Sequence, residues 1–392
     1  MANRAPAASF EYVDTPADVE RLTAEIADAS EIALDTEGAS FHRFVDRIYL
    51  LQLSTRTRHA VIDPLAVGTP AALGAMLEDP KVEVVFHDAD YDLRLLEQDY
   101  GWHVNNIFDT RIAAQLLGYT AFGLAALLER FFGVKLDKKH QRADWSMRPL
   151  TADMLDYAAQ DTRYLLELKD KMSAELERMG RMAWAREEFG LLEGTRWSDE
   201  EPGMGFLKLK GARDLTRREL AVLRELVPWR DEVSRQLDRA TFRVLGNEQL
   251  LDIARTQPST RDALGKIKGM PRGILEQRGG ELLDAVKRAL AVPDNELPKF
   301  PRAARWDRDA DFDTRVSALK TARDEAAKRL TLDPGVLCSR DRMEAVARRN
   351  PASEADFAEI PELRKWQSAE LGKAFVAALK PHRKSGESPY KA

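Results

Sequence analysis

The chain has 392 residues, of which 44% are hydrophobic and 32% are charged, and its net charge is -5. This length predicts two or three domains, and the composition excludes collagen-like and intrinsically disordered proteins. The single cysteine, Cys338, excludes an intramolecular disulfide framework and a cysteine-ligated zinc finger, and it favours a reducing cytoplasm. The longest apolar run near a helix, residues 121–128, is far shorter than the roughly 20 residues of a membrane helix. Because the N-terminus also shows no secretory signal, we expect no membrane association.

The first half of the chain alternates predicted strands and helices. Strands are expected at 31–37, 47–54 and 59–63, with no room for helices between them, so they must be antiparallel neighbours. The next elements expected are a helix with Thr69 as N-cap and Pro70 in its first turn, and a strand at 83–87. A helix capped by Asp90 and running to about Tyr100, a strand at 107–108 and a helix capped by Asp109 should follow. A long helix is predicted over 151–179, ending at Gly180. This order predicts an α/β domain whose sheet has mixed strand directions.

The second half shows only helical patterns and contains an internal repeat. Residues 197–205 predict a linker into this half. Residues 242–258 and 335–351 each have a Val-Leu pair, an amphipathic helix, Ala-Arg and a closing proline, and each is followed by a short segment and a longer helix. The matching order predicts two related helical domains joined by the proline-rich linker 293–301.

The charges are distributed unevenly between the two halves. Residues 1–192 have 32 Asp and Glu against 21 Lys and Arg, whereas residues 206–290 have 12 against 18. This asymmetry favours metal ions in the acidic half and phosphates near the basic half, although modest imbalances also occur on ordinary solvated surfaces.

Three short motifs of the first half contain candidate active-site residues. Asp35 and Glu37 lie two apart on a strand and so point to the same face, and Tyr157 and Asp161 lie four apart on one helix face. Asp92 follows the strand at 83–87. Each motif alone is as typical of a solvated surface, but together ALDTE (33–37), HDADYDL (87–93) and YAAQD (157–161) offer four carboxylates. Carboxylate oxygens suit Mg²⁺ or Mn²⁺ rather than Zn²⁺, and two such ions can promote phosphodiester hydrolysis.

In the order and spacing of these motifs the chain resembles ribonuclease D, a 3′-5′ exonuclease of the DEDD superfamily, tyrosine subtype. The segments 109–118 and 137–149 are also similar to that family, and the helical repeats resemble HRDC domains, most clearly in Pro228-Trp229-Arg230-Asp231 and Val244-Leu245. The resemblance implies an RNase H-like exonuclease domain over 1–195, a linker over 196–209, an HRDC domain over 210–292, a linker over 293–304, a second HRDC-like domain over 305–381 and a tail over 382–392.

The resemblance also implies roles for the motif residues. Asp35, Glu37 and Asp161 would hold one divalent ion, and Asp35 the other, with Asp92 acting through water. Tyr157 would orient the attacking water, because a tyrosine with a pKa near 10 is a poor general base at neutral pH. The expected reaction releases 5′-mononucleotides from the 3′ ends of tRNA and other structured RNA precursors and needs two Mg²⁺ or Mn²⁺ ions but no organic cofactor.

Substrate contacts are less sharply indicated. His87, Gln52, Trp145 and Arg148 are candidates for RNA contacts, although a structural role explains each of them as well. A basic stretch formed by Lys208, Lys210, Arg213, Arg217 and Arg218 could guide RNA, although HRDC copies can also serve as spacers or protein contacts. Two other functions stay open, namely a DNA 3′-5′ exonuclease of repair and a non-catalytic RNA-binding scaffold.

Overall fold

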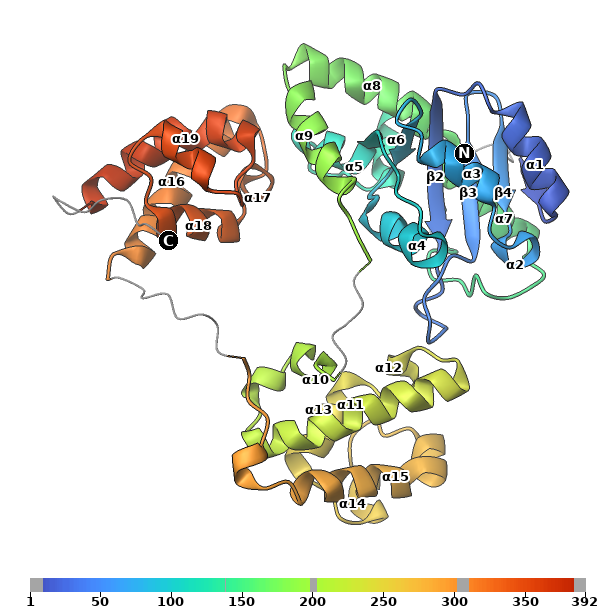
Figure 1. The fold of residues 1–392 in the computed structure, drawn as a ribbon, viewed down its shortest axis with the longest axis vertical. Coiled ribbons are helices and arrows are strands. Elements are labelled where there is room, and N and C mark those ends of the chain that lie inside the picture. Colours follow the sequence, from blue (N-terminus) through green and yellow to red (C-terminus); the bar gives the residue numbers. More distant parts are fainter. Residues whose placement is uncertain (1–9, 138, 198–202, 302–309, 384–392) are drawn as a thin grey trace.

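The computed structural model describes residues 10–137, 139–197, 203–301 and 310–383, which form one α/β domain and two helical domains (Figure 1). Residues 198–202 of the predicted linker 197–205 lie outside the described residues, as does much of the tail. Among the described helices, none is long and apolar enough to cross a membrane.

A six-stranded mixed sheet forms the centre of the α/β domain. Its strand order is β1-β4-β3-β2-β5-β6, and β2 pairs antiparallel with β3, as β3 does with β4. The predicted antiparallel neighbours are therefore confirmed, and the parallel pairs β1–β4, β2–β5 and β5–β6 complete the expected mixed sheet. The strands are β1 (Glu11–Val13), β2 (Glu31–Glu37), β3 (Leu50–Ser54), β4 (His59–Ile62), β5 (Glu83–Phe86) and β6 (Ile107–Asp109).

Helices cover both faces of this sheet. Ile32 and Leu34 of β2 pack with α1 (Pro16–Glu25), α3 (Ala71–Leu77) and α4 (Asp90–Tyr100). Ala33 points to the opposite face, where the helices are α5 (Thr110–Leu116), α6 (Leu124–Phe132), α7 (Ala152–Arg163), α8 (Leu165–Arg178) and α9 (Met182–Leu192). Because side chains alternate along a strand, Asp35 and Glu37 share the face of Ala33 and meet α7.

Three local predictions in this domain are wrong. The helix predicted over 151–179 is interrupted at Tyr164 (φ -104°, ψ 0°), because α7 packs on β2, β3 and β4 whereas α8 packs on β2 and β5. Asp90 does not cap α4, since Ala89 occupies the N-cap and Asp90 instead pairs with Arg94 at 2.8 Å. Pro70 is the N-cap of α3, so Thr69 lies outside that helix. The elements β1, α1, α2 (Pro64–Val67), α6 and α9 were not predicted.

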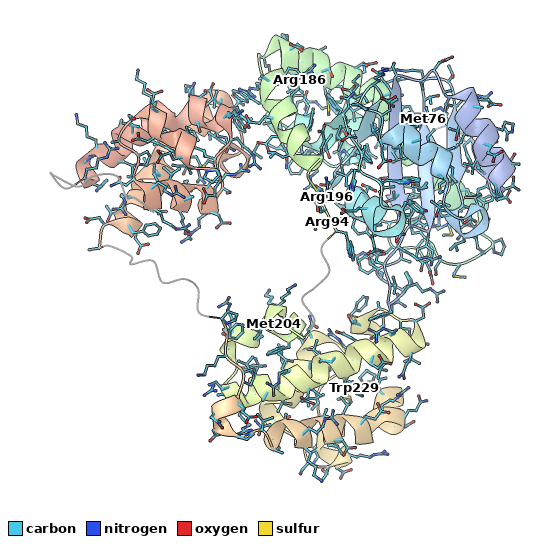
Figure 2. The ribbon with its side chains drawn as sticks, in the orientation of Figure 1. Met76, Arg94, Arg186, Arg196, Met204 and Trp229 are labelled. Carbon is cyan, nitrogen blue, oxygen red and sulfur yellow. The ribbon has the colours of Figure 1, made fainter. Side chains whose placement is uncertain are left out.

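The two helical domains repeat one arrangement. The first contains α10 (Gly205–Lys208), α11 (Arg217–Leu237), α12 (Thr241–Val244), α13 (Asn247–Thr256), α14 (Arg261–Gly265) and α15 (Arg272–Leu290), and the second contains α16 (Phe312–Leu330), α17 (Pro334–Leu337), α18 (Arg340–Arg349) and α19 (Lys365–Leu379). Buried Arg230 of α11 corresponds to buried Arg323 of α16. Trp229, the residue before Arg230 on α11 (labelled in Figure 2), donates to Glu281 of α15 at 2.8 Å. The predicted internal repeat is confirmed.

Parts of the predicted linkers 196–209 and 293–304 pack on the first helical domain. Phe206 and Leu297 are buried in its core, and Phe300 packs against that core. Arg217 of α11 donates to the Leu297 carbonyl at 2.7 Å. The first helical domain therefore begins before residue 210 and extends beyond residue 292, into both stretches that the sequence predicts as linkers.

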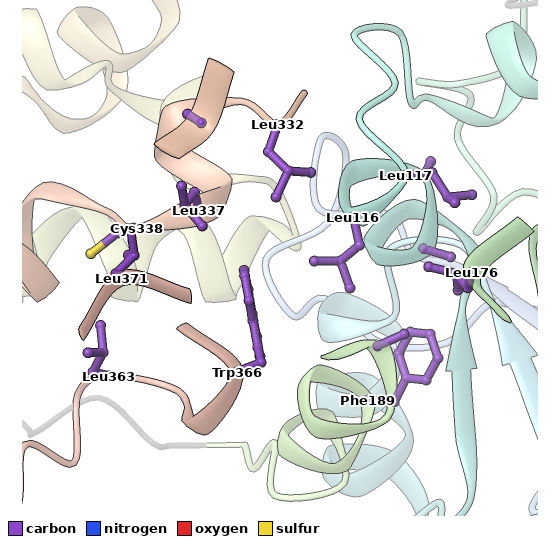
Figure 3. Packing of buried hydrophobic residues seen from close by; sticks show 14 of the residues in the cluster. Leu116, Leu117, Leu176, Phe189, Leu332, Leu337, Cys338, Leu363, Trp366 and Leu371 are labelled. Carbon is purple, nitrogen blue, oxygen red and sulfur yellow. The ribbon is translucent and has the colours of Figure 1, made fainter. Parts of the chain in front are cut away.

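The second helical domain docks on the α/β domain through one continuous hydrophobic cluster. Leu116 and Phe189 from the α/β domain and Leu332 and Trp366 from the helical domain belong to it (Figure 3). The Trp366 ring stacks on Trp184 with a centroid separation of 4.7 Å, and its indole N–H donates to Glu188 at 2.8 Å. Apolar burial and charge-assisted hydrogen bonds thus hold the two domains together.

Replacing Gly118 by alanine should loosen this docking. Gly118 has φ 84°, and a Cβ there would clash with the Thr331 carbonyl oxygen of the second helical domain. We expect a loss of about 3 kcal/mol in the free energy of unfolding, because the left-handed backbone costs about 1–2 kcal/mol and the clash adds to it. Gly101→Ala is the matched control, because Gly101 has φ 71° and nothing within 4 Å of the added Cβ. Denaturant unfolding of both variants gives the comparison, and equal losses would contradict the docking role of Gly118.

Candidate active site

Three carboxylates meet at the C-terminal end of β2. Asp35, Glu37 and Asp161 each offer an oxygen, and these atoms all lie within 4.8 Å of one another. The strand places Asp35 and Glu37 on one face, and α7 crosses that face with Asp161 pointing toward them. The structure therefore brings together residues that are more than a hundred positions apart in the chain.

Asp92 lies beside this group but is turned toward β2. Its Oδ1 accepts from the Thr36 backbone N–H at 3.0 Å and from the Thr36 hydroxyl at 2.5 Å. Thr36 lies between Asp35 and Glu37 and points to the other face of the strand, so this bond ties α4 to the strand that holds two of the acids. Asp109, predicted as a helix cap, is confirmed as the N-cap of α5 and also accepts from Ala89 at 2.8 Å, which steadies the start of α4.

The four carboxyl groups destabilise one another's charged forms. Burial raises the pKa of Asp35 well above its usual range, and the negative charge of Asp161 raises it further. Burial likewise raises the pKa of Glu37 and Asp92, with added repulsion from Asp35. Burial raises the pKa of Asp161 to about 7. Among the described residues, no Lys, Arg or His forms an ion pair with any of the four.

This donor set fits a divalent cation. Carboxylates that are partly withdrawn from water and lie this close together, without a cationic side chain among the described residues to pair with them, are costly unless an ion neutralises them. All the available ligand atoms are carboxylate oxygens, which Mg²⁺ and Mn²⁺ prefer. Asp35, Glu37 and Asp161 are thus residues that could hold a metal ion.

Tyr157 lies one helical turn before Asp161. Its ring packs between Trp145, with a centroid separation of 6.1 Å, and His140, with a separation of 5.8 Å. Burial raises the pKa of Tyr157 well above 10, and the charges of Asp161, Glu37 and Asp35 raise it further. The phenol therefore stays protonated at neutral pH and can donate a hydrogen bond.

Hydroxyl groups hold α7 on the sheet behind these side chains. Ser54 of β3 and Thr162 of α7 form a buried hydrogen bond of 2.7 Å between their hydroxyls, and His59 Nδ1 lies 2.9 Å from the Ser54 oxygen. Because Thr162 directly follows Asp161, this contact fixes the carboxylate over β2 and β3.

Asp35, Glu37 and Asp161 line a cleft of about 850 Å³. Its walls include Tyr157, the segment 38–42 after β2, the start of α6, the pair Leu136-Asp137, the segment 141–143 and Trp145. Phe41, Arg111 and Arg142 also line this cleft and were missed from the sequence. The sequence pattern gave no signal for them, because two loops and the start of α5, far apart in the sequence, bring them to the cleft.

Known proteins match both the domains and the whole chain. The family model of a 3′-5′ exonuclease matches residues 10–177, and that of the HRDC domain matches residues 219–286 and 313–379. The chain is 34% identical to "Ribonuclease D" of Gluconacetobacter diazotrophicus over 284 residues, which cover 72% of this chain and 71% of the relative. It is 29% identical to "Ribonuclease D" of Nitrobacter hamburgensis over 94% of both chains.

Solved structures agree with this match. Escherichia coli RNase D, described as an exoribonuclease involved in structured RNA processing, superimposes with a TM-score of 0.74 and 25% identity. The match covers 96% of this chain and all of that one. The catalytic core of RRP6 from Trypanosoma brucei gives a TM-score of 0.64 at 32% identity, covering 74% of this chain and 83% of that one.

The chain belongs to the ribonuclease D family. It is therefore a hydrolytic 3′-5′ exoribonuclease with an RNase H-like catalytic domain and two HRDC domains, as the motifs had indicated. RNA is its substrate class, and the acidic cluster supports divalent metal binding.

Among the substrate candidates of this ribonuclease D chain, Trp145 and Arg148 face the protein. Trp145 is only 1% exposed and packs on Tyr157, so it does not offer a free ring to a base. Arg148 donates to both oxygens of Asp63, at 2.5 and 2.6 Å, and to the Tyr49 carbonyl at 2.8 Å. This bidentate pair fastens the segment 145–149 to the sheet and leaves Arg148 a structural role.

His87 and Gln52 are also largely enclosed. Burial and the nearby Arg111 lower the pKa of His87 to about 4, so the ring is neutral at pH 7 and brings no positive charge to a phosphate. Its Nδ1 donates to the Thr110 hydroxyl at 2.9 Å. Gln52 pairs with Asp35 across β3 and β2 and is fully buried, and its amide makes no hydrogen bond with a described residue.

The basic stretch of the first HRDC domain divides into exposed lysines and occupied arginines. Lys208 and Lys210 are exposed. Arg218 donates to the carbonyl oxygens of Ala289 and Val292, at 3.1 and 2.6 Å, and Arg213 lies over the Phe300 ring at 4.9 Å. Arg217 and Arg218 donate to backbone carbonyl oxygens of the segment 289–297, so their guanidinium groups are engaged with protein, whereas Arg213 is exposed and contacts the Phe300 ring.

Proposed function

We propose that this exoribonuclease removes nucleotides one at a time from the 3′ ends of tRNA and other structured RNA precursors and releases 5′-mononucleotides. The observation that carries the proposal is the meeting of Asp35, Glu37 and Asp161 in the lining of an open cleft, where none of the described cationic side chains forms an ion pair with them. The domain limits inferred from the sequence and the cytoplasmic location remain predictions.

Two divalent ions, Mg²⁺ or Mn²⁺, would be held by Asp35, Glu37 and Asp161, with Asp92 behind them. Ions bound in such a pair lower the pKa of water and stabilise the leaving oxygen of a phosphodiester. Asp92 would keep β2 in place through Thr36 and add negative charge next to Asp35.

Tyr157 would orient the attacking water. Its protonated hydroxyl lines the cleft and is one turn from Asp161, so it can donate a hydrogen bond but cannot accept the proton of water at neutral pH. Water adds to phosphorus, the P–O3′ bond breaks, and the shortened RNA leaves with a protonated 3′ hydroxyl. Trp145 and His140 hold the phenol at this place.

Digestion of one RNA and its DNA analogue, each with a single-stranded 3′ end, tests the proposal. We expect release of 5′-mononucleotides from RNA with Mg²⁺ or Mn²⁺, at least tenfold slower release from DNA, and none with EDTA. Chromatography of the products identifies the nucleotides. Preference for DNA would instead support a repair exonuclease, and release from neither would support a non-catalytic RNA-binding scaffold.

A further inference from the structure

The loop between β2 and β3 connects the catalytic strand to the first HRDC domain. The His42 carbonyl accepts from the Ala240 N–H at 3.2 Å, and Arg43 forms an ion pair of 3.0 Å with Asp238 at the C-terminus of α11. The Arg235 guanidinium lies over the Phe44 ring at 5.1 Å. Figure 1 shows this loop descending from the sheet toward α12. The start of α12 is therefore held next to the loop that follows Glu37.

The same loop forms part of the cleft wall. Phe41 and His42 line the cleft that contains the acids. His42 Nε2 donates to the Arg142 carbonyl at 3.0 Å, and Arg43 donates to the Ser146 hydroxyl at 2.6 Å. One loop thus contacts the opposite cleft wall and the first HRDC domain at the same time.

Two large aromatic side chains are exposed where the loop meets α12. Phe41 is 43% exposed and Phe242 is 52% exposed, and their rings meet edge to face with a centroid separation of 6.2 Å. The Arg142 guanidinium lies 5.2 Å from the Phe41 ring centroid. Phenylalanine side chains in folded proteins are usually buried. An exposed pair of them at the edge of a cleft therefore points to a ligand.

Positive charge surrounds this pair. Arg142 lines the cleft, and Arg239 and Arg243 flank Phe242 in sequence and are exposed. Within the described part of the chain, the side chains of Arg239 and Arg243 form no ion pair. Aromatic rings beside exposed guanidinium groups are the combination with which proteins bind single-stranded nucleic acid.

We propose that Phe41 and Phe242 form a base-stacking platform for single-stranded RNA just 5′ of the nucleotide in the cleft. A strand longer than the cleft must leave it across a wall, and Phe41 belongs to both the wall and the exposed pair. Stacking accepts every base, which suits an enzyme that removes nucleotides successively. Arg142, Arg239 and Arg243 would neutralise the phosphates between the stacked bases. The inference rests on the proposed exonuclease function of the cleft.

Phe242→Ala tests the platform without touching the acids. For the wild type and the variant, kcat/KM is measured on an RNA dinucleotide and on an unstructured RNA of about ten nucleotides. We expect the ratio of the long to the short substrate to fall about tenfold, within the range for the loss of one stacked base. Phe242→Tyr should restore the ratio and Phe242→Leu should not. Leu290→Ala is the matched control, because Leu290 is 43% exposed on α15 of the same domain.

Abasic substrates separate stacking from domain packing. A single abasic site is placed in turn at the second to fifth nucleotide from the 3′ end. Stacking predicts one position at which the abasic loss and the Phe242→Ala loss do not add. Additive losses at every position, or an unchanged ratio, would overturn the platform and leave Phe242 as a domain contact or a protein-binding residue. A wild type that releases no nucleotide from either substrate would instead refute the exonuclease proposal itself.

Discussion

Asp35→Asn should reduce the rate of nucleotide release roughly a thousandfold or more while leaving the chain folded. Asp35 is central to the acidic group, because its charge raises the pKa of both Glu37 and Asp92. An amide of nearly the same shape keeps the packing of β2 but removes a negative charge from the metal-binding oxygens. Losing several kcal/mol of stabilisation in the transition state corresponds to a rate loss of this size.

The measurement is single-turnover release of 5′-mononucleotides in saturating Mg²⁺, with circular dichroism to verify the fold. Asp90→Asn is the matched control, because Asp90 is exposed, forms an ion pair with Arg94 on the same helix and lies two residues from Asp92. We expect the control to keep near wild-type rates. A wild-type rate in a folded Asp35→Asn variant would refute the assignment of these carboxylates.

The motifs predicted the acidic group because regular secondary structure fixes side-chain direction. Strand alternation placed Asp35 and Glu37 on one face, and helical spacing placed Tyr157 above Asp161. Their meeting could be inferred only from the combination of motifs and the resemblance, because no local pattern states how α7 crosses the sheet. The Ser54–Thr162 bond that fixes this crossing joins residues 108 positions apart.

Predictions that depended on distant partners were less successful. Arg148 has the chemistry of a phosphate ligand, but Asp63, which lies 85 positions earlier, occupies its guanidinium. Arg218 is occupied in the same way by the carbonyl oxygens that end α15. A residue caps a helix only if it directly precedes the first residue with helical backbone angles. Asp109 does so at α5, as predicted, whereas Asp90 already lies inside α4. The sequence therefore shows which side chains could bind a phosphate. Only the fold shows which of them are not already occupied by protein partners.

Metal affinity should rise with pH between 6 and 8, up to about tenfold per pH unit for each proton that the metal displaces. Burial raises the pKa of Asp161 to about 7, so below pH 7 the metal-free cleft holds at least one proton that the ion must displace. Titration with Mn²⁺ at pH 6, 7 and 8, followed by calorimetry in two buffers of different ionisation enthalpy, gives both the affinity and the protons released. An affinity that does not change over this range would contradict the raised pKa.

The same protons set how the metal-free chain responds to pH. A carboxyl whose folded pKa is raised stabilises the fold at low pH, and this stability is lost as pH rises through about 7. The pKa of His87 is lowered to about 4, so its ionisation makes the free energy of unfolding rise with pH between 4 and 6.5, opposite to the effect of the carboxyl groups. The effect of the carboxyl groups is therefore clearest above pH 6.5. The variant Asp161→Asn tests this dependence, because it leaves His87 unchanged and removes the ionisation of one carboxyl group. In EDTA at pH 8 its free energy of unfolding should exceed that of the wild type by about 2 kcal/mol, a value reduced because solvent enters the open cleft. Denaturant unfolding at pH 6.5 and 8 measures the difference, and saturating Mn²⁺ should reverse its sign because only the wild type retains all the metal-binding carboxylates.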